Sequence, residues 1–210
     1  LTIGGSSQGT MTIGDLDDNT PVARFDVALR ALVAGEEGRL CDGFSFNFGD
    51  ISTLGGTYPK VLSAGVSVVF TDGYASYPYS DRTISISANG NVIRSVPVAP
   101  DRTDDGQWHG VSITYERDTG LTVSWTGPSG TVTVSATAQE LSAQGFIAHG
   151  GSRFLFNATS GGIAATHTID DLSITTLPVI EPVPDQITAE GELLIVPITV
   201  HGSSLTLALQ

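Results

Sequence analysis

Apolar and polar residues alternate with a period of two through most of the chain. In "DGFSFNFG" the rings of Phe44, Phe46 and Phe48 alternate with small polar residues, the pattern of a strand with one buried face. The segment "FDVALRALVAGEEG" could form a short helix, but residues 25–33 alternate just as well, and we count them among the strand-like segments. Further segments of this kind are "GVSVVF", "RTISISANGNVIRSVPV", "HGVSITYE", "GLTVSWTG", "GTVTVSAT" and "IDDLSITT". The pattern predicts an all-β protein.

Turn residues separate these segments at short intervals. Asn89-Gly90 between two alternating runs predicts a tight hairpin, and residues 118–120 and 127–130 mark two more connections. Many short strands with such spacing predict a β-sandwich or a jelly roll. We expect Trp108 and Trp125 to fill its interior, and His109 and His167 to pack in the core.

A change in composition suggests a domain boundary. Residues 1–176 form the predicted sandwich domain, and the three prolines of residues 177–185 predict a stiff, extended linker. Residues 186–210 contain two further apolar strands, too few for a sandwich of their own. We interpret them as the opening strands of an immunoglobulin-like or cadherin-like repeat, or as a segment that docks elsewhere. The absence of an initiating methionine suggests that the chain is processed or excised from a longer one.

Charge and hydropathy exclude some partners. The 210 residues include 22 acidic and 9 basic ones, a net charge of −13, and Lys60 is the sole lysine. An acidic surface repels phosphate backbones, so nucleic acid is not an expected partner. No stretch is apolar over the length of a membrane span. Few charged residues and many Gly, Ser and Thr residues are typical of extracellular β proteins, so we expect an extracellular or cell-surface location.

Four segments in sequence order resemble the L-type lectin family, the concanavalin A-like jelly rolls of legume seeds and of bacterial surface proteins. They are "CDGFSFNFG", "GVSVVFTDGY", "DGQWHGVSITYERDTGLTV" and "FLFNATSGGIAATHTIDDLSI", and the resemblance spans residues 20–176. It implies a concanavalin A-like sandwich with a sugar site formed by four loops at one end. A carboxylate there accepts hydrogen bonds from sugar hydroxyls, and an aromatic ring covers the apolar face of the sugar.

The resemblance also implies which residues form that site. Asp42 is the carboxylate of the first loop, the second loop donates a backbone N–H from a glycine, the third supplies an aromatic platform, and the fourth closes the site through its backbone. The alternative for Asp42 is an ordinary turn residue before a glycine. The implied ligand-binding residues are Asp42, Gly55, Gly56, Asp72, Tyr74 (with Tyr77 and Tyr79 nearby), Ser160, Gly161 and Gly162.

The family's metal strand is altered. Legume members hold calcium and a transition metal through Glu-x-Asp, where this chain has Val69 and Thr71, so we expect no ion there and no required cofactor. If Ca²⁺ is bound, we expect it at Asp15, Asp17 and Asn19, which have the one-three-five spacing of a calcium loop, or beside Asp170. A solvated acidic turn is the alternative for the first of these sites.

Hydrolysis is not expected. The β-glucanases with this jelly roll use a Glu-x-Asp-x-x-Glu strand, and the chain contains no such segment. Two classes of function therefore remain. The first is a carbohydrate-binding, lectin-like module of a secreted or cell-surface bacterial protein, with a glycan or polysaccharide as partner. The second is a structural or adhesive domain without a sugar site, which associates with other copies or domains of a surface protein.

Overall fold

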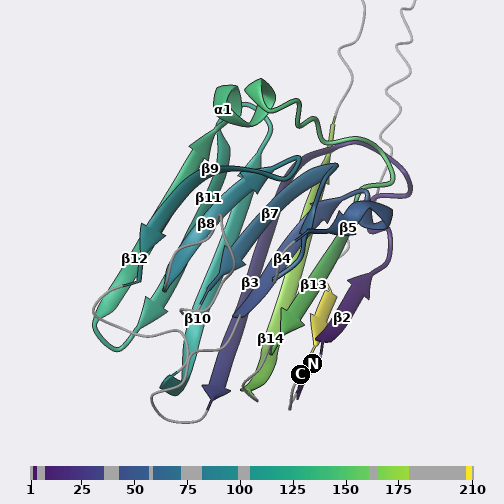
Figure 1. Ribbon diagram of the computed structural model, residues 1–210. Coiled ribbons are helices and arrows are strands. Elements are labelled where there is room, and N and C mark those ends of the chain that lie inside the picture. Colours follow the sequence, from purple (N-terminus) through teal and green to yellow (C-terminus); the bar gives the residue numbers. More distant parts are fainter. Residues whose placement is uncertain are drawn as a thin grey trace, which may run out of the picture.

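Two antiparallel sheets face each other in the computed structural model of the chain (Figure 1). It describes residues 2–3, 8–35, 43–56, 59–71, 82–98, 105–160, 165–179 and 207–209. Each large sheet contributes one apolar face to the interior. The predicted jelly-roll sandwich is confirmed.

The seven-stranded sheet has the order β1-β14-β3-β10-β11-β12, and β15 also pairs with β14. Its long central strands alternate apolar and polar residues, so one face is buried and the other is polar. The strands are β1 (Thr2–Ile3), β3 (Val22–Gly35), β10 (Asp105–Glu116), β11 (Gly120–Gly127), β12 (Gly130–Thr137), β14 (Ala165–Pro178) and β15 (Leu207–Leu209).

The six-stranded sheet has the order β2-β13-β4-β7-β8-β9. A small hairpin, β5 with β6, lies over the face of this sheet that points away from the core; we call this face the outer face. The strands are β2 (Gln8–Ile13), β4 (Gly43–Gly49), β5 (Leu54–Gly55), β6 (Val61–Leu62), β7 (Gly65–Phe70), β8 (Thr83–Ala88), β9 (Asn91–Pro97) and β13 (Arg153–Thr159).

One hydrophobic core fills the space between the sheets. Phe44, Phe46 and Phe48 all point inward and are at most 4% exposed, as predicted. Phe25 of β3 lies opposite them, 4.8 Å from the ring of Phe48 and 5.8 Å from that of Phe46. Aromatic rings at such distances add to the stabilisation from buried area. The alternation seen in the sequence therefore forms the core directly.

Trp108 is a correction to the sequence prediction. It is 41% exposed, whereas Trp125 is fully buried as expected. His109, Val111, Ile113 and Tyr115 alternate inward along β10, so the adjacent Trp108 faces outward, and the two neighbours cannot both be in the core. The guanidinium of Arg30 lies 5.1 Å above the Trp108 ring, a cation–π contact on the polar face of the sheet.

Short helical elements also differ from the expectation. Residues Ala138–Ala143 form helix α1 and Ile51–Thr53 a single 3₁₀ turn, η1. Thr137 and Glu140 form a complete capping box at the start of α1. The predicted hairpin at Asn89-Gly90 is confirmed, with both residues at positive φ between β8 and β9.

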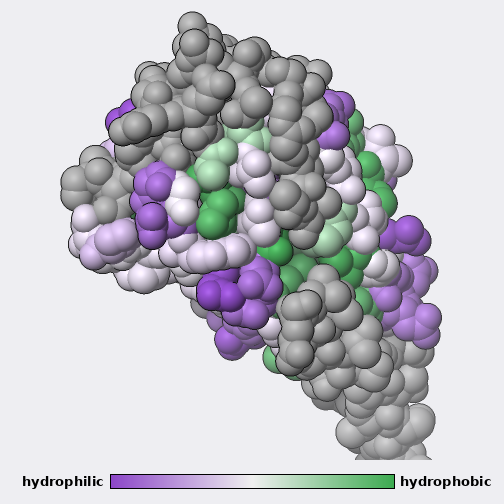
Figure 2. Space-filling model, turned by 90° about the horizontal axis from the view of Figure 1, so that it is seen from below, coloured by the Kyte–Doolittle hydropathy of each residue, from purple (hydrophilic) through white to green (hydrophobic). Residues whose placement is uncertain are grey.

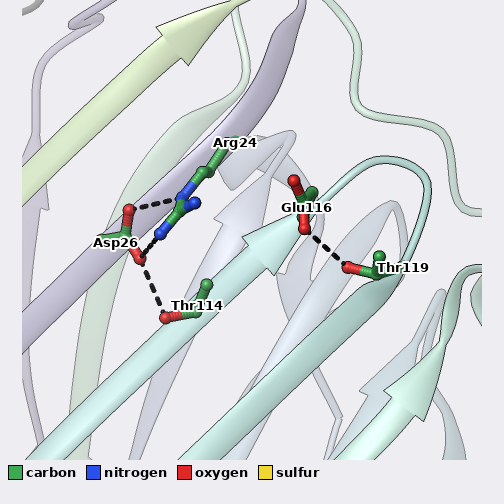
Figure 3. A network of polar contacts seen from close by, with 5 residues as sticks. All are labelled: Arg24, Asp26, Thr114, Glu116 and Thr119. Atoms are coloured by element: carbon green, nitrogen blue, oxygen red, sulfur yellow. Dashed lines mark hydrogen bonds and ion pairs between the residues drawn. The ribbon is translucent and has the colours of Figure 1, made fainter.

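The polar face of the seven-stranded sheet is hydroxyl-rich over β11 and β12. Three cross-strand pairs join their hydroxyls at 3.0–3.1 Å: Thr122 with Ser135, Ser124 with Thr133, and Thr126 with Thr131. Charged residues on this face pair with one another. Figure 3 shows Asp26, whose carboxylate accepts hydrogen bonds from Arg24 at 2.8 Å and from Thr114 at 2.9 Å. The negative charge of Asp26 is thus balanced by the positive charge of Arg24.

Residues 207–209 pair with residues 172–174 of β14 in antiparallel fashion. The division into a sandwich domain, a linker and a following segment remains a prediction, because most of residues 180–210 lies outside the described part of the chain. Among the described residues, no helix has the length and apolar character needed to span a membrane.

Candidate functional site

Three neighbouring strands bring the expected binding segments to one end of the sandwich. Strand β4 begins at Gly43, which pairs with Thr159 at the end of β13, while Phe44 pairs with Phe70 at the end of β7. Thr71 and Ser160 follow these strand ends directly. This is the lower end in Figure 1, and Figure 2 looks onto it. We call it the loop end.

Several predicted site residues lie outside the described part of the chain. They are Asp42, Asp72, Tyr74, Tyr77, Tyr79, Gly161 and Gly162. Asp42 directly precedes Gly43, Asp72 directly follows Thr71, and Gly161 directly follows Ser160. The strand register thus brings the attachment points of these segments together, and the roles of their side chains remain predictions.

Gly43 fixes where the chain enters β4. Its φ is +106°, and a Cβ built on it would lie 2.0 Å from the carbonyl oxygen of Phe70 and 3.2 Å from Cα of Thr71. A side chain cannot be accommodated at such distances, and only glycine adopts this φ without strain. The Asp-Gly pair that the sequence interpretation offered as turn chemistry therefore contains a glycine required by the close approach of two strands.

An aromatic stack supports the loop end from inside. The rings of Phe44 and Phe70 lie 4.5 Å apart and nearly parallel, Phe70 lies 5.4 Å from Trp125, and Trp125 lies 4.5 Å from His109. The stack crosses from the six-stranded to the seven-stranded sheet. His109 Nε2 lies 2.8 Å from a carboxylate oxygen of Asp105. These contacts give the loop end a rigid floor.

The hairpin of β5 and β6 carries the two predicted glycines. Gly55 pairs with Val61, and Gly56 follows at φ +85° in an exposed position. The hairpin lies on the outer face of the six-stranded sheet, because Lys60 at the start of β6 is hydrogen-bonded to Ser45 and Asn157. Backbone groups near Gly56 therefore lie beside the strands that lead to the loop end.

Ser160 is 3% exposed at the end of β13. Its burial fits the role implied by the resemblance, in which the fourth loop contributes backbone groups and not this hydroxyl. The predicted use of Gly161 and Gly162 lies outside the described residues.

The strand that corresponds to the family's metal strand does not fit a metal ion. Val69 is fully buried and packs with Val61 and Val92, so it contributes an apolar contact and no ligand. The Thr71 hydroxyl accepts a hydrogen bond from the Thr83 N–H at 3.1 Å and lies 3.1 Å from the Thr83 hydroxyl. Neither residue offers the oxygen-rich, charged environment that Ca²⁺ requires.

The alternative calcium residues lie at the opposite end of the sandwich, between β2 and β3. The Asp15 carboxylate accepts hydrogen bonds from the backbone N–H groups of Asp17 and Asn19 at 3.0 and 2.8 Å. Asp17 is 2% exposed; burial raises the pKa of its carboxyl, a contact with Thr176 lowers it, and nearby Asp15 raises it further. Within the described ranges no three His, Cys, Asp or Glu residues gather as a metal site. Calcium at Asp15, Asp17 and Asn19 remains a prediction.

Asp170, the other position at which calcium was expected, lies with Asp171 in the middle of β14. They lie inside β14 at an irregularity in its pairing with β3. Both carboxylates approach Arg30 at 2.7 Å, and Asp171 has a positive φ of 51°. Their charges are therefore engaged by an arginine on the polar face of the seven-stranded sheet.

A groove of about 650 Å³ lies at the end opposite the loop end. It is lined by residues of segments 145–147, 149–153, 49–52 and 64–65, together with Asn89. Its lining includes the side chains of Asp50, His149 and Arg153; hydrogen bonds from Ser52 lower the pKa of the Asp50 carboxyl. The sequence interpretation did not identify this groove, because glycine-rich segments far apart in the chain build it. Its volume suits a ligand, but it lies at the opposite end of the six-stranded sheet from Gly43, Thr71 and Ser160.

Comparison with known proteins shows the fold of the chain. No protein-family model and no curated protein sequence matches it. Solved structures do match: they are legume and L-type lectins, and they show that the chain has the fold of a concanavalin A-like sandwich.

Three of these structures show the extent of the similarity. The seed lectin of Lotus tetragonolobus has a TM-score of 0.63 and 18% identity, covering 87% of this chain and 94% of that one. The lectin from Bauhinia forficata, in complex with GalNAc, has a TM-score of 0.58 and 16% identity, with coverages of 83% and 78%. The exoplasmic/lumenal domain of VIP36, in a form bound to Ca²⁺ and Man3GlcNAc, has a TM-score of 0.56 and 14% identity, with coverages of 95% and 83%.

Proposed function

We propose that the chain is a carbohydrate-binding, lectin-like module of a secreted or cell-surface bacterial protein, with a glycan or polysaccharide as its partner. The observation that carries the proposal is the register of β4, β7 and β13. It places Gly43, Thr71 and Ser160 at one end of the sheet, so that the segments containing Asp42, Asp72, Tyr74, Gly161 and Gly162 begin there. The fold and its sugar-binding neighbours add support.

The activity proposed is binding without catalysis. Support comes from the sequence, in which the seven glutamates do not form the Glu-x-Asp-x-x-Glu strand of the hydrolases with this fold. Asp42 accepts hydrogen bonds from sugar hydroxyls in this proposal, Tyr74 covers an apolar sugar face, and backbone groups of Gly55, Gly56 and residues 160–162 complete the site.

A structural or adhesive domain without a sugar site is the second candidate. It is favoured by Val69 and Thr71, which engage other residues of the protein where the legume members bind metal. In that function the partners are other copies or domains of a surface protein.

Screening the whole chain on an array of immobilised glycans and polysaccharides tests the proposal. We expect a defined subset of glycans to bind, and binding to weaken in Asp42→Asn and Tyr74→Ala. Arg24→Gln, on the polar face of the seven-stranded sheet, is the control and should bind normally. Absence of binding to every glycan, with the variants folded, favours the structural candidate.

A further inference from the structure

The hairpin of β5 and β6 is held through the backbone N–H and the backbone carbonyl of one residue, Lys60. The Lys60 N–H donates to Asn157 Oδ1 at 3.1 Å, and the Lys60 carbonyl accepts a hydrogen bond from Ser45 Oγ at 2.7 Å. Ser45 and Asn157 are both 0% exposed. Two buried side chains thus fix both polar groups of the main chain at Lys60, whatever its own side chain does.

These two side chains belong to the strands that lead to the loop end. Ser45 lies on β4, two residues after Gly43, and Asn157 lies on β13, three residues before Ser160. Asn157 Nδ2 also donates to the Gly9 carbonyl at 3.2 Å and to the Thr10 hydroxyl at 3.2 Å, on β2. The position of the hairpin is therefore tied to the strands on which the first and fourth binding segments begin.

A second set of contacts holds the hairpin at Leu62, two residues after Lys60. The Leu62 N–H donates to Ser67 Oγ at 3.0 Å, and Ser67 Oγ donates to Asn47 Oδ1 at 2.6 Å. Asn47 Nδ2 in turn donates to Ser45 Oγ at 3.0 Å. A series of linked, buried hydrogen bonds stabilises one arrangement of these side chains, because every broken bond leaves a polar group unsatisfied.

The same hairpin contacts the strand that lacks metal ligands. Val61 of β6 packs against Val69, the residue found where the family's metal strand carries a glutamate. At this position the hairpin is therefore held by apolar contact and by hydrogen bonds from neighbouring strands.

We propose that Ser45 and Asn157 are positioning residues for glycan binding, because they clamp the peptide groups of Lys60 and so hold Gly55 and Gly56 beside the loop end without a metal ion. This inference rests on the proposed function for its link to glycans. The clamp itself is a property of the folded chain.

Two variants and a matched control test the clamp. Ser45→Ala removes the donor to the Lys60 carbonyl, and Asn157→Leu removes the acceptor for the Lys60 N–H at similar volume. Ser87→Ala, in which a hydroxyl that is 1% exposed is removed from β8, is the control. Hydrogen exchange of the peptide covering residues 54–63 is measured by mass spectrometry, with the melting temperature of each protein.

Exchange in this peptide should become about tenfold faster in Ser45→Ala and Asn157→Leu than in Ser87→Ala, as expected when a buried hydrogen bond is lost. Affinity for a glycan identified on the array should fall about fivefold to tenfold in Ser45→Ala, whose melting temperature stays close to that of the control. The wild-type protein should keep its affinity in EDTA.

Unchanged exchange in both variants overturns the clamp, and unchanged affinity in spite of faster exchange overturns its role in binding. Loss of wild-type affinity in EDTA would show that binding needs a metal ion, and this overturns the inference that the clamp holds the hairpin in place without one. Wild-type protein that binds no glycan overturns the proposed function, and this failure is distinguishable because the exchange measurement needs no ligand.

Discussion

Gly43 lies against Phe70 so closely that a Cβ on Gly43 would be 2.0 Å from the Phe70 carbonyl oxygen. Gly43→Ala should therefore lower the free energy of unfolding by about 2–4 kcal/mol, through overpacking and an unfavourable φ. Urea unfolding followed by tryptophan fluorescence measures this, since Trp125 is part of the stack below.

Gly55→Ala is the matched control for that substitution. A Cβ at Gly55 would have its nearest neighbour at 3.9 Å, an ordinary contact. The control should change stability by less than about 1 kcal/mol. Equal stability of the two variants would contradict the close approach of β4 and β7.

Asp42→Asn separates the two interpretations of Asp42. Asparagine keeps the local turn geometry but loses the charged acceptor, and hydrogen bonds to charged groups contribute about 1.5–3 kcal/mol. Affinity for an array glycan should then fall about tenfold to a hundredfold, while thermal stability stays the same. If Asp42 is a turn residue alone, Asp42→Asn keeps full affinity and Asp42→Ala loses stability. Calorimetric titration and melting curves of both variants measure these quantities.

His167 predicts a dependence of stability on acid. It is 4% exposed, neither ring nitrogen has a hydrogen-bond partner, and burial lowers its pKa from 6.5 to about 4. The unfolded chain therefore binds a proton at a higher pH than the folded one. The contribution of the neutral His167 side chain to the free energy of unfolding is therefore fully present above pH 6.5. It is lost as the pH falls towards 4, because the unfolded chain then binds a proton that the folded chain does not. Each unit of the shift corresponds to ~1.36 kcal/mol, so the loss amounts to about 3 kcal/mol.

His167→Leu should remove this part of the acid dependence, since leucine has no proton to bind, and should be at least as stable as wild type at pH 7. Urea midpoints at pH 7.5, 5.5 and 4.5 give the comparison. His149→Gln, at an exposed position, controls for the loss of a histidine. A His167→Leu protein as acid-sensitive as wild type would show that other groups cause the effect.

Removal of residues 180–210 tests the role of the last segment. Residues 207–209 pair with β14 at residues 172–174, and a truncated chain leaves these backbone groups without that pairing. We expect a melting temperature lower by about 3–6 °C, or association through the newly exposed strand edge. Calorimetry and light scattering check both; a truncated protein identical to wild type in both would mean that the segment adds nothing to the sandwich.

Strand alternation predicted the sandwich well because a buried face imposes the same spacing on every strand that covers it. Phe44, Phe46 and Phe48 follow that rule. Trp108 follows it too: His109, Val111 and Ile113 alternate inward along β10, so the neighbouring Trp108 faces outward, and the expectation that Trp108 and His109 are both buried conflicted with the alternation itself. Helix α1 was not predicted although Thr137 and Glu140 have the spacing of a capping box, because a helix of six residues is too short to show an apolar periodicity.

The site was predictable only in part. The order of the four segments came from short motifs within neighbouring residues, and the register of β4, β7 and β13 agrees with it. The clamp at Lys60 was not predictable, because Ser45 and Asn157 are 15 and 97 residues away in sequence. Each is an ordinary small polar residue on a strand, and its function in the fold arises from three elements meeting on the outer face.

Strand β14 determines how the loop end is presented. It runs for 14 residues from Ala165 at that end to Pro178 at the other, a distance of roughly 45 Å at the rise of a β-strand. Residues 207–209 run antiparallel to residues 172–174 of β14 and therefore head back towards the loop end. A partner protein fused after Val179 would thus stand behind the loop end, whereas one fused after Leu209 would stand nearer to it.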